Sequence, residues 1–217
     1  MSRKKDKLRK SAAANEALTR RDFLKGAGVA VSSGLLVGER ATAAPEGRPD
    51  TVGPGAVPLT LRINGKPQKL TLEPRVTLLD ALRNYLDVTG AKKVCDRATC
   101  GACTVLLDGK PIYACSILAI EAQGKEIQTI EGLVASGKVQ PIMNAFVERD
   151  ALQCGFCTPG FVVATKALLD KNPNPTVQDI EKGLGGTLCR CGVYVGIREA
   201  VLDAAQAMKG GSAHGEV

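Results

Sequence analysis

Alternating apolar and polar residues mark two short strands near the start of the patterned part of the chain, in residues 59–63 and 68–72. Apolar side chains at every second position are typical of a strand with one buried face. An Asn-Gly dipeptide lies between the two runs and favours the tight turn of a β-hairpin. Thr77 then stands where a helix cap is expected, before the apolar positions of residues 78–85. The pattern predicts a hairpin followed by a helix.

A second hairpin is predicted from residues 104–107 and 110–115, which flank a turn at Asp108-Gly109. A loop rich in cysteine separates this hairpin from the predicted helix. Hairpin, helix, loop and returning strand together make a small β-grasp domain, the arrangement of plant-type ferredoxins. We assign this domain to residues 58–135.

From residue 138 onward the apolar period becomes that of amphipathic helices. Thr176 is followed three residues later by Asp179, which is the order of a capping box at a helix start. We expect a four-helix bundle in residues 138–210, so that the whole fold is α+β. The four helices are expected to begin near Pro141, Pro159, Thr176 and Ile197.

The first 43 residues have the order of parts found in a twin-arginine signal peptide. A basic segment ends in Arg20-Arg21, an apolar stretch covers residues 26–38, and residues 41–43 match the A-x-A cleavage rule. The apolar stretch is shorter than the roughly 20 residues that span a bilayer, so we expect no stable membrane insertion. The sequence therefore predicts export to the periplasm. The flanking segments are a Pro- and Gly-rich linker, residues 44–57, and a flexible tail, residues 211–217.

The basic charge of the chain belongs to this N-terminal segment. The sequence has 29 Lys and Arg against 22 Asp and Glu, a net charge of +7. Positions 1–43 hold ten of the basic and four of the acidic residues, so the rest of the chain has 19 basic and 18 acidic residues. A chain with balanced charge and only 3% Phe, Trp and Tyr lacks the basic surface and stacking platforms that bind nucleic acid. We expect no nucleic-acid partner.

The chemistry of the chain is concentrated in eight cysteines, which form two groups of four. The first group has the spacing C-x4-C-x2-C-x11-C, which is that of plant-type 2Fe–2S ferredoxins. The second group consists of two close pairs with a long gap between them, a spacing that fits either a 2Fe–2S cluster or zinc. The two groups are Cys95, Cys100, Cys103 and Cys115, and Cys154, Cys157, Cys189 and Cys191.

A disulfide framework explains the eight cysteines less well. A chain of 217 residues with 44% apolar residues can bury a core without cross-links. A twin-arginine signal also implies folding in the reducing cytoplasm, where thiols stay available for cluster assembly. The single histidine, His214, excludes a Rieske centre with two histidine ligands. It also leaves no nucleophile–histidine pair, so we expect no catalytic residue on this chain.

Six of the eight cysteines lie within three longer motifs: Cys100-Gly-Ala-Cys-Thr104, Gln153-Cys-Gly-Phe-Cys-Thr-Pro-Gly160 and Gly186-Thr-Leu-Cys-Arg-Cys-Gly192. With these motifs the sequence resembles the iron–sulfur small subunit of xanthine-oxidase-family molybdenum hydroxylases, and the resemblance covers about residues 59–208. With the export signal, the periplasmic aldehyde oxidoreductases are the most similar members.

The resemblance implies an electron-transfer subunit of an aldehyde or N-heterocycle oxidoreductase. It implies that the eight cysteines hold two 2Fe–2S clusters, and that Gln153 and Cys191 approach a molybdopterin on a large partner subunit. The cluster of the helical domain would be nearest that molybdopterin, and the other would pass electrons to an FAD-binding subunit or an external acceptor. The family usually has Gly where this chain has Ala98, so a positive φ there would strain the loop. A free-standing two-cluster ferredoxin and a zinc-stabilised adaptor protein remain as alternatives.

Overall fold

The computed structural model describes Arg21 and residues 52–210. The predicted signal peptide apart from Arg21, residues 44–51 of the predicted linker, and the predicted tail lie outside the described residues. Among the helices of the described part, none is long and apolar enough to cross a membrane. Residues 52–210 belong to one compact unit, which carries both cysteine groups.

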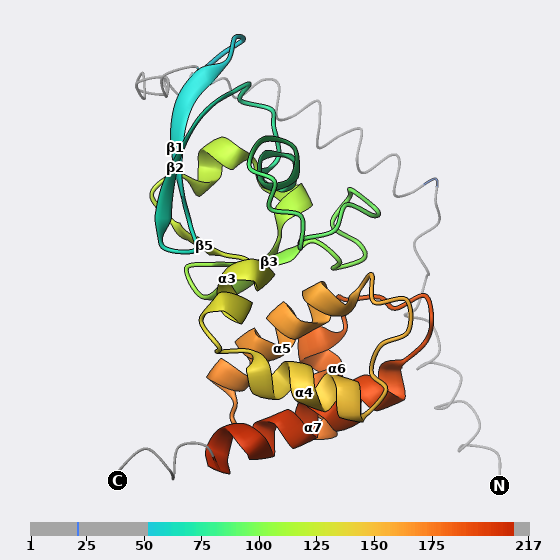
Figure 1. The fold of residues 1–217 in the computed structure, drawn as a ribbon. Helices are drawn as coiled ribbons and strands as arrows, with labels where there is room; N and C mark the ends of the chain where they lie inside the picture. Colours follow the sequence, from blue (N-terminus) through green and yellow to red (C-terminus); the bar gives the residue numbers. More distant parts are fainter. Residues whose placement is uncertain (1–20, 22–51, 211–217) are drawn as a thin grey trace, which may run out of the picture. The chain divides into compact units, whose positions relative to one another are not determined.

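A five-stranded sheet in the order β2-β1-β5-β3-β4 forms the first half of this unit (Figure 1). Both predicted hairpins are confirmed, since β1 pairs with β2 and β3 with β4, each antiparallel. A strand that the sequence pattern did not predict, β5, joins the hairpins by pairing parallel to β1 and antiparallel to β3. The strands are Val57–Ile63, Lys66–Leu72, Thr104–Leu107, Lys110–Tyr113 and Glu126–Gln128.

The two hairpin turns have the backbone that their sequences predicted. Asn64 and Gly65 have φ of 51° and 79°, and Asp108 and Gly109 have φ of 50° and 76°. Positive φ at both central residues is the signature of a type I′ turn, whose twist matches that of the strands.

The predicted helix after the first hairpin begins at Thr77, whose hydroxyl accepts a hydrogen bond from the Asp80 N–H. It continues from α2 (Leu78–Asp80) into one wider, π-helical turn, η1 (Ala81–Tyr85). Short 3-10 turns follow β4 and precede β5: η2 (Ala114–Ser116) and η3 (Ala119–Ala122). The core of this half lies between the helix and the sheet and includes Leu61, Leu78, Leu79, Leu82, Val105 and Ile127.

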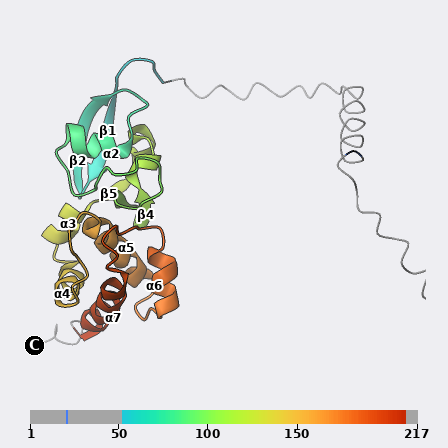
Figure 2. The same ribbon diagram turned by 90° about the vertical axis from the view of Figure 1, so that its right-hand side faces the viewer.

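The second half is helical, as predicted, and the fold class is α+β (Figures 1 and 2). α4 packs against α7, and α5 packs against α6 and against β3. The capping box of α6 is formed by Thr176 and Asp179. A short helix that the sequence pattern did not predict, α3, precedes the other four. The helices are Ile130–Ala135, Gln140–Glu148, Thr158–Lys171, Val177–Leu184 and Tyr194–Gly210.

Strand β3 belongs to the cores of both halves. All four of its residues are buried. Val105 and Leu107 lie in the core of the first half, whereas Leu106 lies in the helical core with Phe146 and Phe161. Since neighbouring side chains of a strand point to opposite faces, the helical half covers the sheet face that Leu106 occupies. Because the cysteine loop leads directly into β3, this packing fixes the end of the loop against the helical half.

Candidate iron–sulfur centres

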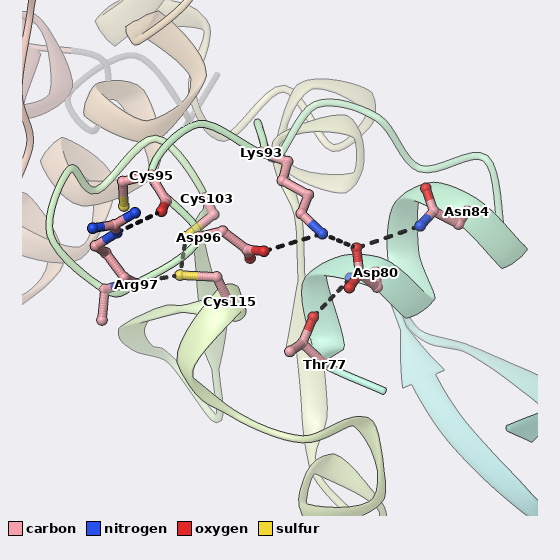
Figure 3. Close-up of polar contacts among 10 residues, drawn as sticks. Thr77, Asp80, Asn84, Lys93, Cys95, Asp96, Arg97, Cys103 and Cys115 are labelled. Carbon is pink, nitrogen blue, oxygen red and sulfur yellow. Dashed lines mark hydrogen bonds and ion pairs between the residues drawn. The ribbon is translucent and has the colours of Figure 1, made fainter. Parts of the chain in front are cut away.

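The first cysteine group lies on the loop before β3 and on the turn after β4. The loop is curled by positive φ at Asp96 (52°), Ala98 (54°) and Gly101 (68°). Cys103 Sγ lies 3.4 Å from Cys115 Sγ, although the two residues belong to different segments (Figure 3). The curled loop and the returning hairpin therefore bring the thiols of Cys103 and Cys115 together.

Backbone N–H groups of the same loop point at its sulfur atoms. The Ala98 N–H donates to Cys115 Sγ at 3.3 Å, and the Thr99 N–H donates to Cys95 Sγ at 3.4 Å. Such donors stabilise thiolates, which are the form of cysteine that binds metal. Partial burial works against the ionisation of Cys95, but the N–H groups of Arg97 and Thr99 outweigh it and lower the pKa of Cys95 to about 7.

Two buried cysteines, Cys103 and Cys157, have pKa values shifted upward instead. Burial raises the pKa of Cys103 to about 12, and the thiol of Cys115 beside it adds to the shift. Burial and the neighbouring thiol of Cys189 likewise raise the pKa of Cys157 to about 12. A cation would have to displace these protons, because a metal ligand must be the thiolate. These thiols are therefore protonated at neutral pH unless a metal supplies compensating charge.

The second cysteine group lies where α5 and α7 begin. Cys157 is the N-cap residue of α5, and Cys189 and Cys191 lie in the turn before α7. Cys157 and Cys189 lie close enough to influence each other's ionisation, and so do Cys154 and Cys191. The first pair is buried and the second is exposed.

The second group has the four thiols that either a 2Fe–2S cluster or a structural zinc ion would need. A 2Fe–2S cluster takes two thiolates on each of its two irons, whereas structural zinc has four ligands around one ion. A donor set made only of thiols is also the set that iron–sulfur clusters use.

The two cysteine groups lie on loops that touch each other. The Leu188 N–H, next to Cys189, donates to the Cys100 carbonyl at 2.9 Å. The Tyr113 hydroxyl donates to the Gly186 carbonyl at 3.0 Å. These contacts join a ligand loop of the first half to a ligand loop of the second.

Glycines permit this close approach. A Cβ added at Gly160 would lie 2.6 Å from the Gly101 carbonyl oxygen, and one at Gly101 would lie 2.6 Å from that of Gly186. Both distances are below van der Waals contact, so no other residue fits without a shift of the backbone. Gly101, Gly160 and Gly186 all lie within the motifs of the resemblance, but only the structure shows that they pack against one another's loops.

Exposed apolar residues flank the two exposed cysteines along the chain. Phe156 and Leu188 are each 51% exposed and Val195 is 60% exposed, and Leu152 is exposed as well. Gln153, which the resemblance places near the molybdopterin, is also exposed. We call Leu152, Phe156, Leu188 and Val195 the apolar rim. Exposed apolar clusters of this kind mark sites where another molecule binds.

Ala98 has the left-handed backbone for which glycine is the usual residue, with φ of 54°. The strain that the sequence comparison with the family suggested is therefore present at this position. Two further contributors were not predicted: Tyr113, which links the two loops, and Tyr194, whose hydroxyl bonds the backbone of Cys189. No local pattern marks either tyrosine, because each acts on a residue that folding brings to it.

Two cysteine-bearing halves of this kind define a two-domain 2Fe–2S protein. The "2Fe-2S iron-sulfur cluster binding domain" model matches residues 61–129, and the "[2Fe-2S] binding domain" model matches residues 129–202. The aldehyde oxidoreductase iron-sulfur-binding subunit PaoA of Escherichia coli (strain K12) is 39% identical over 207 residues, 88% of this chain and 90% of that protein. The nicotinate dehydrogenase small FeS subunit of Eubacterium barkeri is 42% identical over 145 residues, 67% of this chain and 92% of that protein.

Among solved structures, quinoline 2-oxidoreductase from Pseudomonas putida 86 superposes with a TM-score of 0.67 at 39% identity. The match covers 72% of this chain and 98% of that chain. The chain thus belongs to the family of iron–sulfur small subunits of xanthine-oxidase-type molybdenum hydroxylases, and it is a subunit of an oxidoreductase.

Proposed function

We propose that this chain carries electrons from a molybdopterin on a large partner subunit to an FAD-binding subunit or an external acceptor. Two 2Fe–2S clusters, one in each half, would supply one-electron redox steps when bound. The observation that carries the proposal is the presence of two complete thiol quartets on loops in direct contact. The proposed ligands are Cys95, Cys100, Cys103 and Cys115 for one cluster, and Cys154, Cys157, Cys189 and Cys191 for the other.

The large subunit would bind over the helical-domain site. Cys154 and Cys191 are exposed, whereas the first group has no fully exposed member. Gln153 and the residues of the apolar rim are exposed and lie within four positions of one of these cysteines in the sequence. A docked partner would bury the rim and exclude water from the thiols, which strengthens every charge interaction there. Gln153 and Cys191 are the residues proposed to face the pterin.

The chain's own groups would tune the two sites differently. The first site receives N–H donors from Ala98 and Thr99, which stabilise negative charge on sulfur. The second site has two exposed thiols that depend on a partner for burial. Electrons would therefore enter at a site completed by the complex and leave through one that the chain encloses by itself.

We also propose that the protein works in the periplasm after twin-arginine export. The support is the order of the basic segment, the Arg20-Arg21 pair, the apolar stretch and the A-x-A site. The twin-arginine route carries folded proteins, so clusters assembled in the cytoplasm would survive export.

Purification of the native complex, followed by metal and flavin analysis, tests the function directly. We expect four iron atoms and four acid-labile sulfides per copy of this chain, together with molybdenum and FAD in the same size-exclusion peak. Stoichiometric zinc with no visible colour would point to the adaptor protein instead. A coloured monomer without molybdenum in every preparation would point to a free-standing ferredoxin.

A further inference from the structure

The hydroxyl of Tyr194 forms hydrogen bonds with both backbone polar groups of one cysteine, Cys189. It accepts a hydrogen bond from the Cys189 N–H at 2.8 Å and donates one to the Cys189 carbonyl at 3.2 Å. The Gly192 N–H also donates to that carbonyl, at 3.3 Å, and Gly192 has φ of 80°. These bonds close a tight loop of residues 189–194 that carries the exposed Cys191.

The ring of Tyr194 is fixed by packing from another helix. It meets the ring of Phe161 edge to face, with centroids 6.4 Å apart and an angle of 74° between the planes. Phe161 is buried in α5 and its N–H donates to the Cys157 carbonyl at 3.1 Å. Tyr194 therefore connects the backbone of Cys189 to the helix that begins at Cys157.

We infer that Tyr194 is a positioning residue for the helical-domain cluster: its hydroxyl holds Cys189 in place and sets how Cys191 is presented to the partner subunit. The inference rests on the proposed ligand assignment. Tyr194 touches only the backbone of a ligand. Groups that orient ligands in this way change metal affinity by about 10- to 100-fold when they are removed.

The substitution Tyr194→Phe tests the inference, because it keeps the ring against Phe161 and removes only the hydroxyl. The purified complex would be reduced and its two cluster signals recorded by EPR, and iron release to a chelator would be followed in parallel. We expect the helical-domain signal to change in g-values and midpoint potential, and its iron to be lost on the order of 10-fold faster. The ferredoxin-domain signal should not change.

Tyr85→Phe is the matched control, since it removes the same hydroxyl from a side chain that is 55% exposed. It should leave both EPR signals and both release rates as in the wild type. A Tyr194→Phe complex with four irons, a lower melting temperature and unchanged EPR and potential would show a structural role only and overturn the inference. A wild-type complex with a single cluster would instead overturn the ligand assignment, and the inference with it.

If Tyr194→Phe yields no soluble complex, 3-fluorotyrosine at position 194 keeps the ring and the hydroxyl but alters the strength of both hydrogen bonds. The helical-domain EPR signal must then still shift while the other signal stays constant. An unchanged helical-domain signal in that protein would also overturn the inference.

Discussion

At the scale of single residues, the first cysteine loop depends on backbone shape more than on side-chain identity. The N–H of Ala98 reaches the Cys115 sulfur only because Ala98 has a φ of 54°. A residue with a Cβ pays roughly 1 kcal/mol for this conformation, and glycine does not. The loop thus keeps its sulfur contact at the expense of some local strain.

Relief of this strain is testable with Ala98→Gly. Because the N–H donor to Cys115 is kept, we expect the free energy of unfolding to rise by up to about 1 kcal/mol, with the cluster content unchanged. Urea unfolding followed by circular dichroism measures the change. Ala135→Gly in the exposed end of α3 is the control, and it should lower stability because the backbone there is helical. A lower unfolding midpoint for Ala98→Gly would show that its backbone is not strained.

At the scale of elements, the capping box of α6 couples the start of that helix to pH. The Thr176 N–H and hydroxyl both donate to the Asp179 carboxylate. These bonds lower the pKa of Asp179 from its ordinary value of 3.8. The bonds favour the ionised form, so their stabilisation is complete at neutral pH and is lost as pH falls through 3.8 toward the lower folded value.

Asp179→Asn should therefore weaken α6 at pH 7 and make no difference at a pH well below 3.8. Hydrogen–deuterium exchange of the α6 segment, compared between wild type and variant at both pH values, measures this directly. Thr176→Ala should cost about 1 kcal/mol at pH 7, as N-cap truncations do. If the protection of α6 in Asp179→Asn equals that of the wild type at pH 7, the carboxylate does not cap the helix.

The elements also show which parts of the fold a sequence can reveal. Both hairpins and the capped helices were predicted because their turns and caps are encoded within a few neighbouring residues. Strand β5 was missed because it has only three residues and only Ile127 is buried. It exists because β1 and β3 offer it open edges, which is a property of the folded sheet.

The candidate sites also have one part that the sequence predicted and one part that only the folded structure shows. Spacing alone grouped the eight cysteines, but it left zinc open for the second group. That Cys157 lies near Cys189, and Cys154 near Cys191, depends on where folding places the start of α5 and the turn before α7. The contribution of Tyr194 was missed for the same reason, since its hydrogen bonds depend on the turn before α7.

At the scale of the whole molecule, export is a prediction that does not depend on the folded part. Replacing Arg20 and Arg21 together by Lys should keep the precursor in the cytoplasm, because the arginine pair is the feature that the export machinery reads. Cell fractionation with N-terminal sequencing of the wild-type product measures location and cleavage, which we expect after residue 43. Periplasmic activity of the double variant, or an exported protein that still begins at Met1, would contradict the signal assignment.

The contact between the two ligand loops leads to a further prediction about the order of electron flow. Leu188 beside Cys189 bonds directly to Cys100, so the two proposed clusters would lie in series along one short stretch of protein. The exposed pair that includes Cys191 is the end that a molybdopterin subunit can reach. Electrons from substrate should therefore reach the helical-domain cluster first and the ferredoxin-domain cluster second.

Serine substitutions in the two sites should consequently have unequal effects. Serine keeps the size of cysteine but is a harder ligand, so the fold can persist while the cluster is lost or its potential falls. Cys191→Ser should abolish bleaching of the complex by its substrate in rapid-mixing absorbance measurements. Cys103→Ser should still allow substrate to bleach the helical-domain cluster, while turnover with the external acceptor falls. If the Cys191→Ser complex bleaches its remaining cluster at the wild-type rate, electrons do not pass the helical-domain site first, and the two clusters work in parallel or in the reverse order.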